Sequence, residues 1–494
     1  MVCGSHPSPP SRRVFWLACL GLAGAVGTVL SAAIAHGPPI LERRWTLLGL
    51  LGLWGVSWVV GVMCARRLAW RVAVPAALVI GVAMRVVALA GPPAISDDLF
   101  RYAWDGRVQD TGVDPYRYPP SAPQLAHLRE PWLWPGPAEC AALHRPPDCT
   151  LVNRPAVRTI YPPAAEGWFW LVYRLGGLGL RHRLWQLAGL ATELAVLAVL
   201  PFALRAWRRD LRWVALYALS PVAAVEVVNN GHVDGLAALF VVVALWVAGS
   251  SGRHRRAASG WAGAALGVAA LIKLYPAVLA AGLANPSSQA RSRWVRLSQS
   301  AGAVGATVAV GYLPHVLAVG THVLGYLPGY LREERYVGGD RFLLLGTVAP
   351  CRGLTFVLAG LAAVGLLLLV WRGAADPPKA MALLFGGLLL VATPVQPWYT
   401  VALLAVATVA GQPVWAVVAA AGYPYYWAVV LDHPRAVLIG RLSYGLALVV
   451  VGVVVVVVWA GTGRRMSHAR GLRPAGLWRG SGGTDWEERS CECW

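Results

Sequence analysis

Two adjacent aspartates, Asp97 and Asp98, open a short charged segment that follows an apolar run. If this segment is a helix, residues three and four positions apart share one face. That face would carry two acids, a base and a phenol: Asp98, Arg101, Tyr102 and Asp105. Such a face could hold a reacting group. The alternative is that Ser96 caps the helix and both aspartates only favour its first turn, where the helix dipole stabilises negative charge.

The polar segment 91–183 contains further cations and aromatic side chains. Arg107 follows Asp105 by two positions, and Arg158 stands just before a Tyr-Pro-Pro sequence. Group transfer at a membrane surface needs a base, cations for an anionic leaving group and aromatic walls, and this segment supplies all three. The alternative is an ordinary structured loop held by surface ion pairs.

Polar residues also interrupt the apolar runs farther along the chain. Residues 229–234 include His232 and Asp234, and they either face a cavity or form a capped turn between two helices, with Gly231 at the bend. Lys273 lies at a break in another apolar run. There it either meets a phosphate or extends to the membrane interface.

Two pairs of residues complete the set of candidates. Trp398 and Tyr399 are either walls of the same site or members of an interfacial aromatic belt. Arg85 and Glu193 stand inside apolar runs, where an ionisable residue is a candidate for function. They could equally pair with each other as structural side chains.

The composition predicts an all-α, polytopic membrane helix bundle. The chain has 494 residues, of which 57% are hydrophobic and only 13% charged. A soluble domain of this length would be less apolar. The formal net charge of +20 would suggest nucleic acid in a soluble protein. Here the arginines gather in short connections between apolar runs, as in cytoplasmic membrane loops, so nucleic acid is not an expected partner.

Twelve apolar runs are long enough, or nearly long enough, to span a membrane. They cover residues 14–34, 46–64, 72–90, 185–204, 212–228, 232–249, 299–319, 354–371, 379–394, 398–411, 413–431 and 437–460. Basic clusters mark one side, and the positive-inside rule assigns that side and both termini to the cytoplasm. The segment 91–183 is then an extracytoplasmic loop.

Local patterns add three predictions to this topology. Residues 164–180 are predicted to be an outer juxtamembrane helix, because a span there would move the basic cluster at 205–212 outside. Residues 261–284 have basic flanks and are predicted to be a hairpin of two half-helices, broken near Lys273. Cys140 and Cys149 lie close together in the outer loop and are predicted to form a disulfide.

Several motifs occur in a fixed order among these apolar runs. They are SDDLFRYAWDGRVQDTGVDPYRYPP, YPP, NNGHVDGLA, LIKLYP and QPWYT. In combination they resemble the bacterial integral-membrane mannosyltransferases that use polyprenyl-phosphate sugars, which belong to the GT-C glycosyltransferase superfamily. The resemblance implies a GT-C-like membrane body at 72–410 whose first large outer loop carries an essential acid. The N-terminal spans at 1–71 lie outside this core, and the spans at 411–460 and a cytoplasmic tail at 461–494 follow it.

The resemblance also implies roles for the candidate residues. Asp98 matches the essential acid, with Asp97 as its partner or rival, and Asp98 would accept the proton of an acceptor hydroxyl. The candidates for substrate binding are Arg101, Tyr102, Asp105, Arg107, Arg158, His232, Asp234, Lys273, Trp398 and Tyr399. Two positions depart from the family pattern: Asp114 replaces an asparagine before Pro-Tyr, and Val233 replaces the asparagine of Gly-His-Asn-Asp. The acceptor and the exact donor therefore stay open.

The expected function is transfer of a hexose, mannose first of all, from a polyprenyl-phosphate donor to a glycan or glycolipid acceptor. The expected location is the outer face of a bacterial cell membrane, with the lipid bilayer as a partner. No cofactor is expected, and the sequence assigns no metal. The main alternative is a secondary transporter or lipid flippase, although the polar residues cluster at one surface rather than at the midplane. A scaffold of an envelope-glycan assembly complex is a further alternative.

Overall fold

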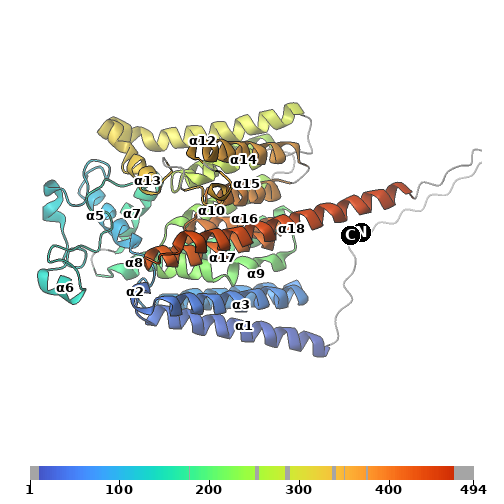
Figure 1. Cartoon of the computed structure of the whole chain (residues 1–494), viewed down its shortest axis with the longest axis horizontal. Coiled ribbons are helices and arrows are strands. Elements are labelled where there is room, and N and C mark those ends of the chain that lie inside the picture. Colours follow the sequence, from blue (N-terminus) through green and yellow to red (C-terminus); the bar gives the residue numbers. More distant parts are fainter. Residues whose placement is uncertain are drawn as a thin grey trace, which may run out of the picture.

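The structure is a computed structural model that describes residues 10–176, 179–250, 255–283, 290–336, 341–349, 351–373 and 376–471. Within these ranges the chain forms helices and no β-strand. The long helices lie side by side and make up the body of the molecule (Figure 1). The expected all-α, polytopic helical membrane protein is therefore confirmed.

The α-helices differ in length. Those with more than ten residues are α1 (Pro10–His36), α3 (Trp45–Arg67), α4 (Trp70–Ala88), α5 (Asp98–Asp110), α7 (Pro163–Gly176), α8 (His182–Ala206), α10 (Asp234–Ser250), α11 (Arg255–Ala270), α12 (Ala290–Val319), α14 (Arg352–Arg372), α15 (Pro377–Val391), α16 (Thr400–Ala410), α17 (Ala416–Val430) and α18 (Ala436–Gly471). The shorter ones are α2 (Ile40–Arg43), α6 (Pro137–Ala142), α9 (Val214–Ala218) and α13 (Leu327–Glu333). A π-helix, η3 (Ala223–Asn229), and 3₁₀ helices, among them η4 (Tyr275–Leu283) and η7 (Pro397–Tyr399), connect them.

The number of membrane spans is smaller than the sequence predicts. In the described part of the chain, seven helices are long and apolar enough to cross a membrane, or eight if Leu211–Ala218 and Ala223–Asn229, bent by 57°, count as one span. The other four predicted spans form α10, α15, α16 and α17, with 17, 15, 11 and 15 residues. At 1.5 Å per residue, such helices are shorter than a hydrocarbon core of about 30 Å. The expectation of about twelve full spans is corrected accordingly.

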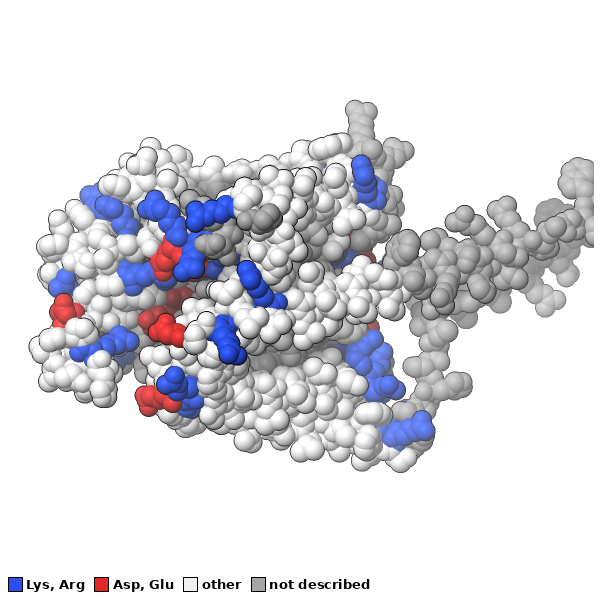
Figure 2. All heavy atoms as spheres, in the orientation of Figure 1, with Lys and Arg blue, Asp and Glu red and all other residues white. Residues whose placement is uncertain are grey.

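The segment 91–183 lies at one end of the bundle, and the start of α1 and the end of α18 lie toward the other. Figure 1 shows α5, α6, α7 and α13 together at one end, whereas α1 begins and α18 ends toward the other. On the face shown in Figure 2, most of the visible Asp and Glu residues lie at the α5–α7 end, and a band nearly free of charge separates the two ends. This arrangement fits a bundle that crosses a membrane. The assignment of the α5–α7 end to the outside stays a prediction.

The two irregular segments named from the sequence are both present. α7 has 14 residues, too few to span a membrane, and it packs on α5. α11 ends at Ala270 and η4 begins at Tyr275, so the predicted break near Lys273 is confirmed. The first backbone N–H groups of α7, from Ala164 and Ala165, bond to the carbonyl oxygen of Leu271 at 2.9 and 3.1 Å. This contact fastens the break to the α5–α7 end; residue 284, the end of the predicted hairpin, lies outside the described residues.

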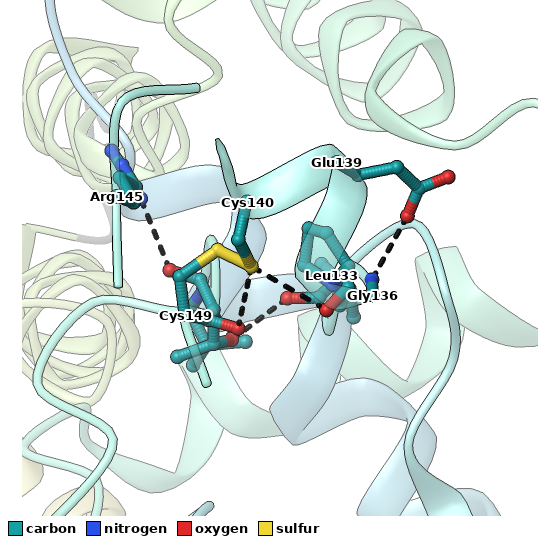
Figure 3. The surroundings of a disulfide bond; sticks show 9 residues. Leu133, Gly136, Glu139, Cys140, Arg145 and Cys149 are labelled. Carbon is teal, nitrogen blue, oxygen red and sulfur yellow. Dashed lines mark hydrogen bonds between the residues drawn. A yellow bond between two sulfur atoms is a disulfide. The ribbon is translucent and has the colours of Figure 1, made fainter. Parts of the chain in front are cut away.

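A disulfide joins Cys140 and Cys149 in the outer loop, as predicted (Figure 3). Cys140 is buried in the short helix α6, which begins at Pro137 with Glu139 accepting the Gly136 N–H through its side chain. Arg145, between the two cysteines, donates to the carbonyl oxygen of Thr150. The bridge therefore closes a compact hydrogen-bonded loop at the outer end of the molecule.

One hydrophobic cluster holds the bundle together, and a second attaches the outer loop to it. The larger one runs through the body and includes Leu20 of α1 and Trp54 of α3, so the first two spans pack into the common core. The second joins the outer loop to the bundle, because it contains Phe169 of α7 together with Val233 and Ile272. The site lies where this second cluster meets the bundle. The division of the chain at 71, 410 and 460 stays a prediction.

Candidate active site

The start of α5 is held against the turn at 229–234. The side-chain oxygens of Asn229 and Asn230 accept the backbone N–H groups of Ala94 and Ile95 at 2.9 and 3.0 Å. Gly231 has a φ of +71°, which a residue with a side chain rarely adopts, and this turns the chain between the asparagines and the residues that follow. The two asparagines thus act as structural caps, whereas the next polar residues of the turn face the site.

Asp98 stands at the first position of α5 and lines a small pocket. The pocket is formed by Asp98, Arg101, Asn153, Arg154, Val157, Arg158, Ile160, Tyr161 and Tyr326. Asn153 Nδ2 donates to Asp98 Oδ1 at 2.6 Å, and Tyr161 Oη donates to Asp98 Oδ2 at 3.3 Å. The Asp98 side chain keeps 16% exposure. Its carboxylate is therefore both oriented by the protein and open to a ligand.

Asp97 lies beside Asp98 but outside the pocket lining. Asn153 Nδ2 is 3.2 Å from Asp97 Oδ1, so one amide bridges both carboxylates. The side chain of Asp97 is exposed, but desolvation by the surrounding protein and then the neighbouring Asp98 carboxylate raise its pKa, while the hydrogen bond from Asn153 opposes the shift. The two aspartates thus occupy different environments. Ser96 Oγ accepts the Asp98 N–H at 3.3 Å, but the cap position of α5 is Asp97, whose side chain makes no capping hydrogen bond, so the prediction that Ser96 caps the helix is corrected.

Arg101 and Asp105 form a buried ion pair along α5. Arg101 Nε lies 2.9 Å from Asp105 Oδ2, and both side chains are only 4% exposed. Arg101 Nη1 donates to the carbonyl oxygens of Arg154 and Val157 at 3.3 Å. Arg101 Nη2 is buried and finds no hydrogen-bond partner among the described residues. One guanidinium nitrogen of Arg101 therefore has an unused donor, and protein atoms cover it in this structure.

The other predicted residues of the outer loop divide between the pocket and the loop core. Arg158 lines the pocket, with its Nε donating to the Arg117 carbonyl oxygen at 3.2 Å. Tyr102 is buried, with its ring stacked on Phe169 at 4.3 Å. Its hydroxyl lies 3.4 Å from that of Tyr161, next to Asp98.

Arg107 is not brought to the pocket. It pairs with Glu130, at 2.5 Å between Nη1 and Oε1, and also bonds Tyr173 Oη and the Leu128 carbonyl oxygen. Its position two residues after Asp105 turns it to another face of α5, because residues two apart on a helix do not face the same way. Its contacts are those of a residue that holds the outer loop together.

His232 lies on the inner side of Asp98, between two carboxylates. Its Nδ1 is 3.8 Å from Asp98 Oδ2 and its Nε2 is 3.6 Å from Glu226 Oε2. The ring is fully buried and stacks on Trp398, with 4.2 Å between the centroids. Trp398 is thus a wall of this site rather than only a belt residue.

Lys273 and Asp234 form the next charged pair of the same cluster. Lys273 Nζ is 3.3 Å from Asp234 Oδ2, and it lies 5.0 and 5.4 Å from the ring centroids of Tyr161 and Tyr399. Tyr275 Oη donates to Asp234 Oδ1 at 3.3 Å. Lys273 is 13% exposed and pairs with a buried acid, Asp234. The alternative that its side chain extends to the membrane interface is therefore corrected.

Asn153, Tyr161 and Glu226 are among the site residues that lie outside the set of candidates drawn from the sequence. Asn153 has no sequence signal, because an amide in a polar loop is common. Tyr161 belongs to the Tyr-Pro-Pro sequence that the loop analysis noted without giving this tyrosine a role. Glu226 carried a usable signal: it is a lone acid inside an apolar run, the same signal that drew attention to Glu193.

The charged groups of the cluster do not form an evident metal centre. No group of three or more His, Cys, Asp or Glu side chains in the described ranges is arranged to hold a metal ion. What the arrangement offers is the partly open carboxylate of Asp98, arginines in the same pocket lining, and the ammonium group of Lys273 near the rings of Tyr161 and Tyr399. These are the groups that a displacement with an anionic leaving group requires.

Residues 159–394 match the sequence model of glycosyltransferase family 87. The match supports a membrane glycosyltransferase of the GT-C type. It includes His232, Asp234 and Lys273 but begins after the Asp97-Asp98 pair. A search of curated proteins gives no match.

Proposed function

We propose that the protein transfers a hexose, with mannose as the first candidate, from a polyprenyl-phosphate carrier to a glycan or glycolipid acceptor at the extracytoplasmic face of the membrane. The observation that carries this proposal is the composition of one pocket: the carboxylate of Asp98 and the guanidinium groups of Arg101 and Arg158 line the same hollow. A base and cations at contact distance are what glycosyl transfer from a phosphate carrier needs.

The proposed reaction is a single displacement at the anomeric carbon of the donor. The acceptor oxygen attacks that carbon while its proton passes to an oxygen of Asp98. The bond from the anomeric carbon to the phosphate oxygen breaks, and the polyprenyl phosphate leaves with the bonding electron pair. One direct displacement inverts the anomeric configuration.

The leaving phosphate is met by the cations of the site. Arg101 Nη2, which has no partner in the described part of the chain, is a candidate donor to such a group, since Arg101 and Asp98 line the same pocket. Guanidinium groups match phosphate oxygens well, because their N–H groups form a planar fork. The polyprenyl chain of the donor would lie among the helices of the bundle. A nucleotide sugar, which has no lipid chain, would not need such a membrane body.

Asn153 and Tyr161 support the choice of Asp98 over Asp97 as the base. Both donate to Asp98 and fix its rotamer, and only Asp98 of the two lines the pocket. In this proposal Asp97 helps to hold Asn153 in place. Its raised pKa then reflects desolvation and the neighbouring Asp98 charge rather than a role in proton transfer.

The test is incubation of the purified full-length protein with radiolabelled polyprenyl-phosphate mannose and a membrane extract that supplies acceptors. A labelled glycan or glycolipid with inverted anomeric configuration is the expected product. A protein that moves the labelled lipid across liposome membranes without forming a product would favour a transporter or flippase and overturn the proposal. Polyprenyl-phosphate glucose, used in parallel, identifies the sugar.

A further inference from the structure

His232 sits between two acids at the centre of the cluster. Its Nδ1 faces Asp98 Oδ2 at 3.8 Å, and its Nε2 faces Glu226 Oε2 at 3.6 Å. In the described chain neither ring nitrogen has a hydrogen-bond partner. A buried polar group without a partner costs stability, so we expect both nitrogens to form hydrogen bonds in another state of the protein, such as the one with substrate bound.

The surroundings of His232 fix the plane of its ring. The imidazole stacks on Trp398 with an interplanar angle of 16°, which keeps both nitrogens directed at the two carboxylates. The backbone N–H of His232 also bonds the Glu226 carbonyl oxygen at 2.9 Å. A small rotation of the carboxylates closes both gaps to hydrogen-bond distance, and catalytic hydrogen bonds often tighten in this way when substrate binds.

Glu226 is held in place from its far side. Tyr423 Oη donates to Glu226 Oε1 at 2.7 Å, and Asn230 Nδ2 donates to Oε2 at 3.4 Å. The residue belongs to the π-helix η3, whose wider turns appear mostly at functional sites. Both carboxylate oxygens of Glu226 therefore accept a hydrogen bond, and Oε2, which accepts the longer one, also faces the histidine.

Resting on the proposed function, we propose that His232 is a proton-relay residue that acts through Asp98, with Glu226 holding the opposite ring nitrogen. As the acceptor oxygen bonds to the anomeric carbon, its proton moves to Asp98 Oδ2 and then to His232 Nδ1. The proton already on Nε2 is shared with Glu226 Oε2, so the imidazolium lies between two acceptors. When product leaves, the proton returns through Asp98 to water in the pocket, and Asp98 is ionised for the next cycle.

Other charged groups that face the ring act in known directions. Asp98 comes from α5, Glu226 from η3, Asp234 from the start of α10 and Lys273 from the turn before η4. Burial of the ring lowers the pKa of His232, whereas Asp98 and Asp234 favour the imidazolium and Lys273 opposes it. Lys273 is itself paired with Asp234, and the carboxylates that face the two ring nitrogens are those of Asp98 and Glu226.

The experiment compares pH–rate profiles of hexose transfer for the wild type, His232→Gln, Glu226→Gln and the control His315→Gln. His315 is a suitable control because it also contacts an aspartate, with Nδ1 2.7 Å from Asp114 Oδ2, but does not line the pocket. For His232→Gln we expect kcat to fall by about 10-fold or more with KM values changed less than about twofold. We also expect the acidic limb of the pH–rate profile to move to lower pH by about one unit, because Asp98 is then the only residue that accepts the proton.

Glu226→Gln keeps the size and the bond to Tyr423 but removes the negative charge. Its acidic limb should move in the same direction by less, since the imidazolium loses one of its stabilising charges. The His315→Gln limb should stay at the wild-type position. The relay would be overturned if the acidic limb of the pH–rate profile kept its position in both His232→Gln and Glu226→Gln, or if these substitutions changed only KM. If His232→Gln does not fold, Glu226→Gln decides alone.

A second readout does not depend on transfer. The titration of His232 is followed by NMR in the full-length protein labelled at histidine, with His232→Gln identifying the signal. The relay predicts that Glu226→Gln moves this titration to lower pH by about one unit. An unmoved titration contradicts the relay, whereas wild-type protein that transfers no hexose, yet shows the shift, counts against the proposed function only.

Discussion

Two buried charged regions of the molecule differ in how completely their polar atoms are paired. In the middle of the bundle, Arg85 Nε donates to Glu193 Oε2 at 2.9 Å, and Tyr217 Oη donates to Glu193 Oε1 at 2.8 Å. The remaining Arg85 nitrogens donate to the carbonyl oxygens of Gly81, Ala218 and Tyr217. At the outer end, His232 Nδ1 and Nε2, Asp234 Oδ2 and Arg101 Nη2 find no hydrogen-bond partner in the described chain.

The difference separates a structural ion pair from a site. A saturated pair has no donor or acceptor left for a ligand, and its value lies in the packing of the helices that carry it. An unsaturated cluster costs stability in the empty protein and can regain it when a ligand completes the hydrogen bonds. In the sequence, both regions are polar residues among apolar runs, so only their pairing distinguishes them.

The largest expected effect is on stability, at the saturated pair. Arg85→Ala leaves Glu193 buried without a partner, which should destabilise the protein by on the order of 3–5 kcal/mol. The double variant Arg85→Met/Glu193→Met removes both charges and should recover most of that loss while keeping hexose transfer. Thermal unfolding in detergent, with transfer measured in parallel, tests both statements. A stable Arg85→Ala protein would show that the pair is not needed for the fold.

The same double-variant design should give the opposite result at the outer cluster. Lys273→Gln/Asp234→Asn removes both charges of the pair while keeping polar side chains of similar size. Thermal stability should stay close to that of the wild type, but transfer should fall by about 10-fold or more because a cation of the site is lost. Full transfer by this variant would make the pair structural, like Arg85–Glu193, and would remove Lys273 from the site.

A smaller effect is expected at the base of the outer loop, where two acids are buried together. Burial raises the pKa of Glu166 well above its ordinary value, and the nearby Asp105 carboxylate raises it further. Because the pKa of Glu166 is higher in the folded than in the unfolded protein, its protonated form stabilises the fold. This contribution is complete when the pH is below the pKa of the unfolded protein, about 4.3, and it is lost as the pH rises through the pKa of the folded protein.

Glu166→Gln removes this ionisation and keeps an acceptor for Thr159 Oγ1, which donates to Glu166 Oε1 at 2.6 Å. Above neutral pH the variant should unfold at a temperature about 1–2 °C higher than the wild type, and the difference should shrink toward pH 5. Unfolding curves at a series of pH values measure this. A variant that loses stability equally at all pH values would point to a lost hydrogen bond instead.

The fold class and much of the topology could be predicted from hydropathy and charge alone. The break near Lys273, the short helix at 163–176 and the Cys140–Cys149 bridge followed from local patterns and are present. The number of full spans could not be predicted, because α10, α15, α16 and α17 are apolar yet short. Hydropathy measures whether a segment avoids water, not whether protein or lipid surrounds it.

The site was predictable where side chains share one helix and not where they meet across the fold. Arg101 and Asp105 pair through their i, i+4 spacing on α5, as their positions imply. Arg107 resembles them in sequence, but its partner Glu130 lies 23 residues away in the loop. Asn153 reaches Asp98 only through tertiary packing, which a single sequence does not reveal, whereas Glu226 precedes His232 within the same turn of the chain.

The central claim is that Asp98 is the catalytic base and Asp97 is not. Its most direct test is the rate of hexose transfer from labelled polyprenyl-phosphate mannose by purified Asp98→Asn and Asp97→Asn, with thermal unfolding measured for each. Asparagine keeps the size and hydrogen bonding of aspartate but removes its basicity. The account predicts a loss of on the order of 10²-fold or more for Asp98→Asn, a smaller loss for Asp97→Asn and folded protein in both cases. Near-normal transfer by Asp98→Asn would contradict it, and a large loss confined to Asp97→Asn would move the base to that residue.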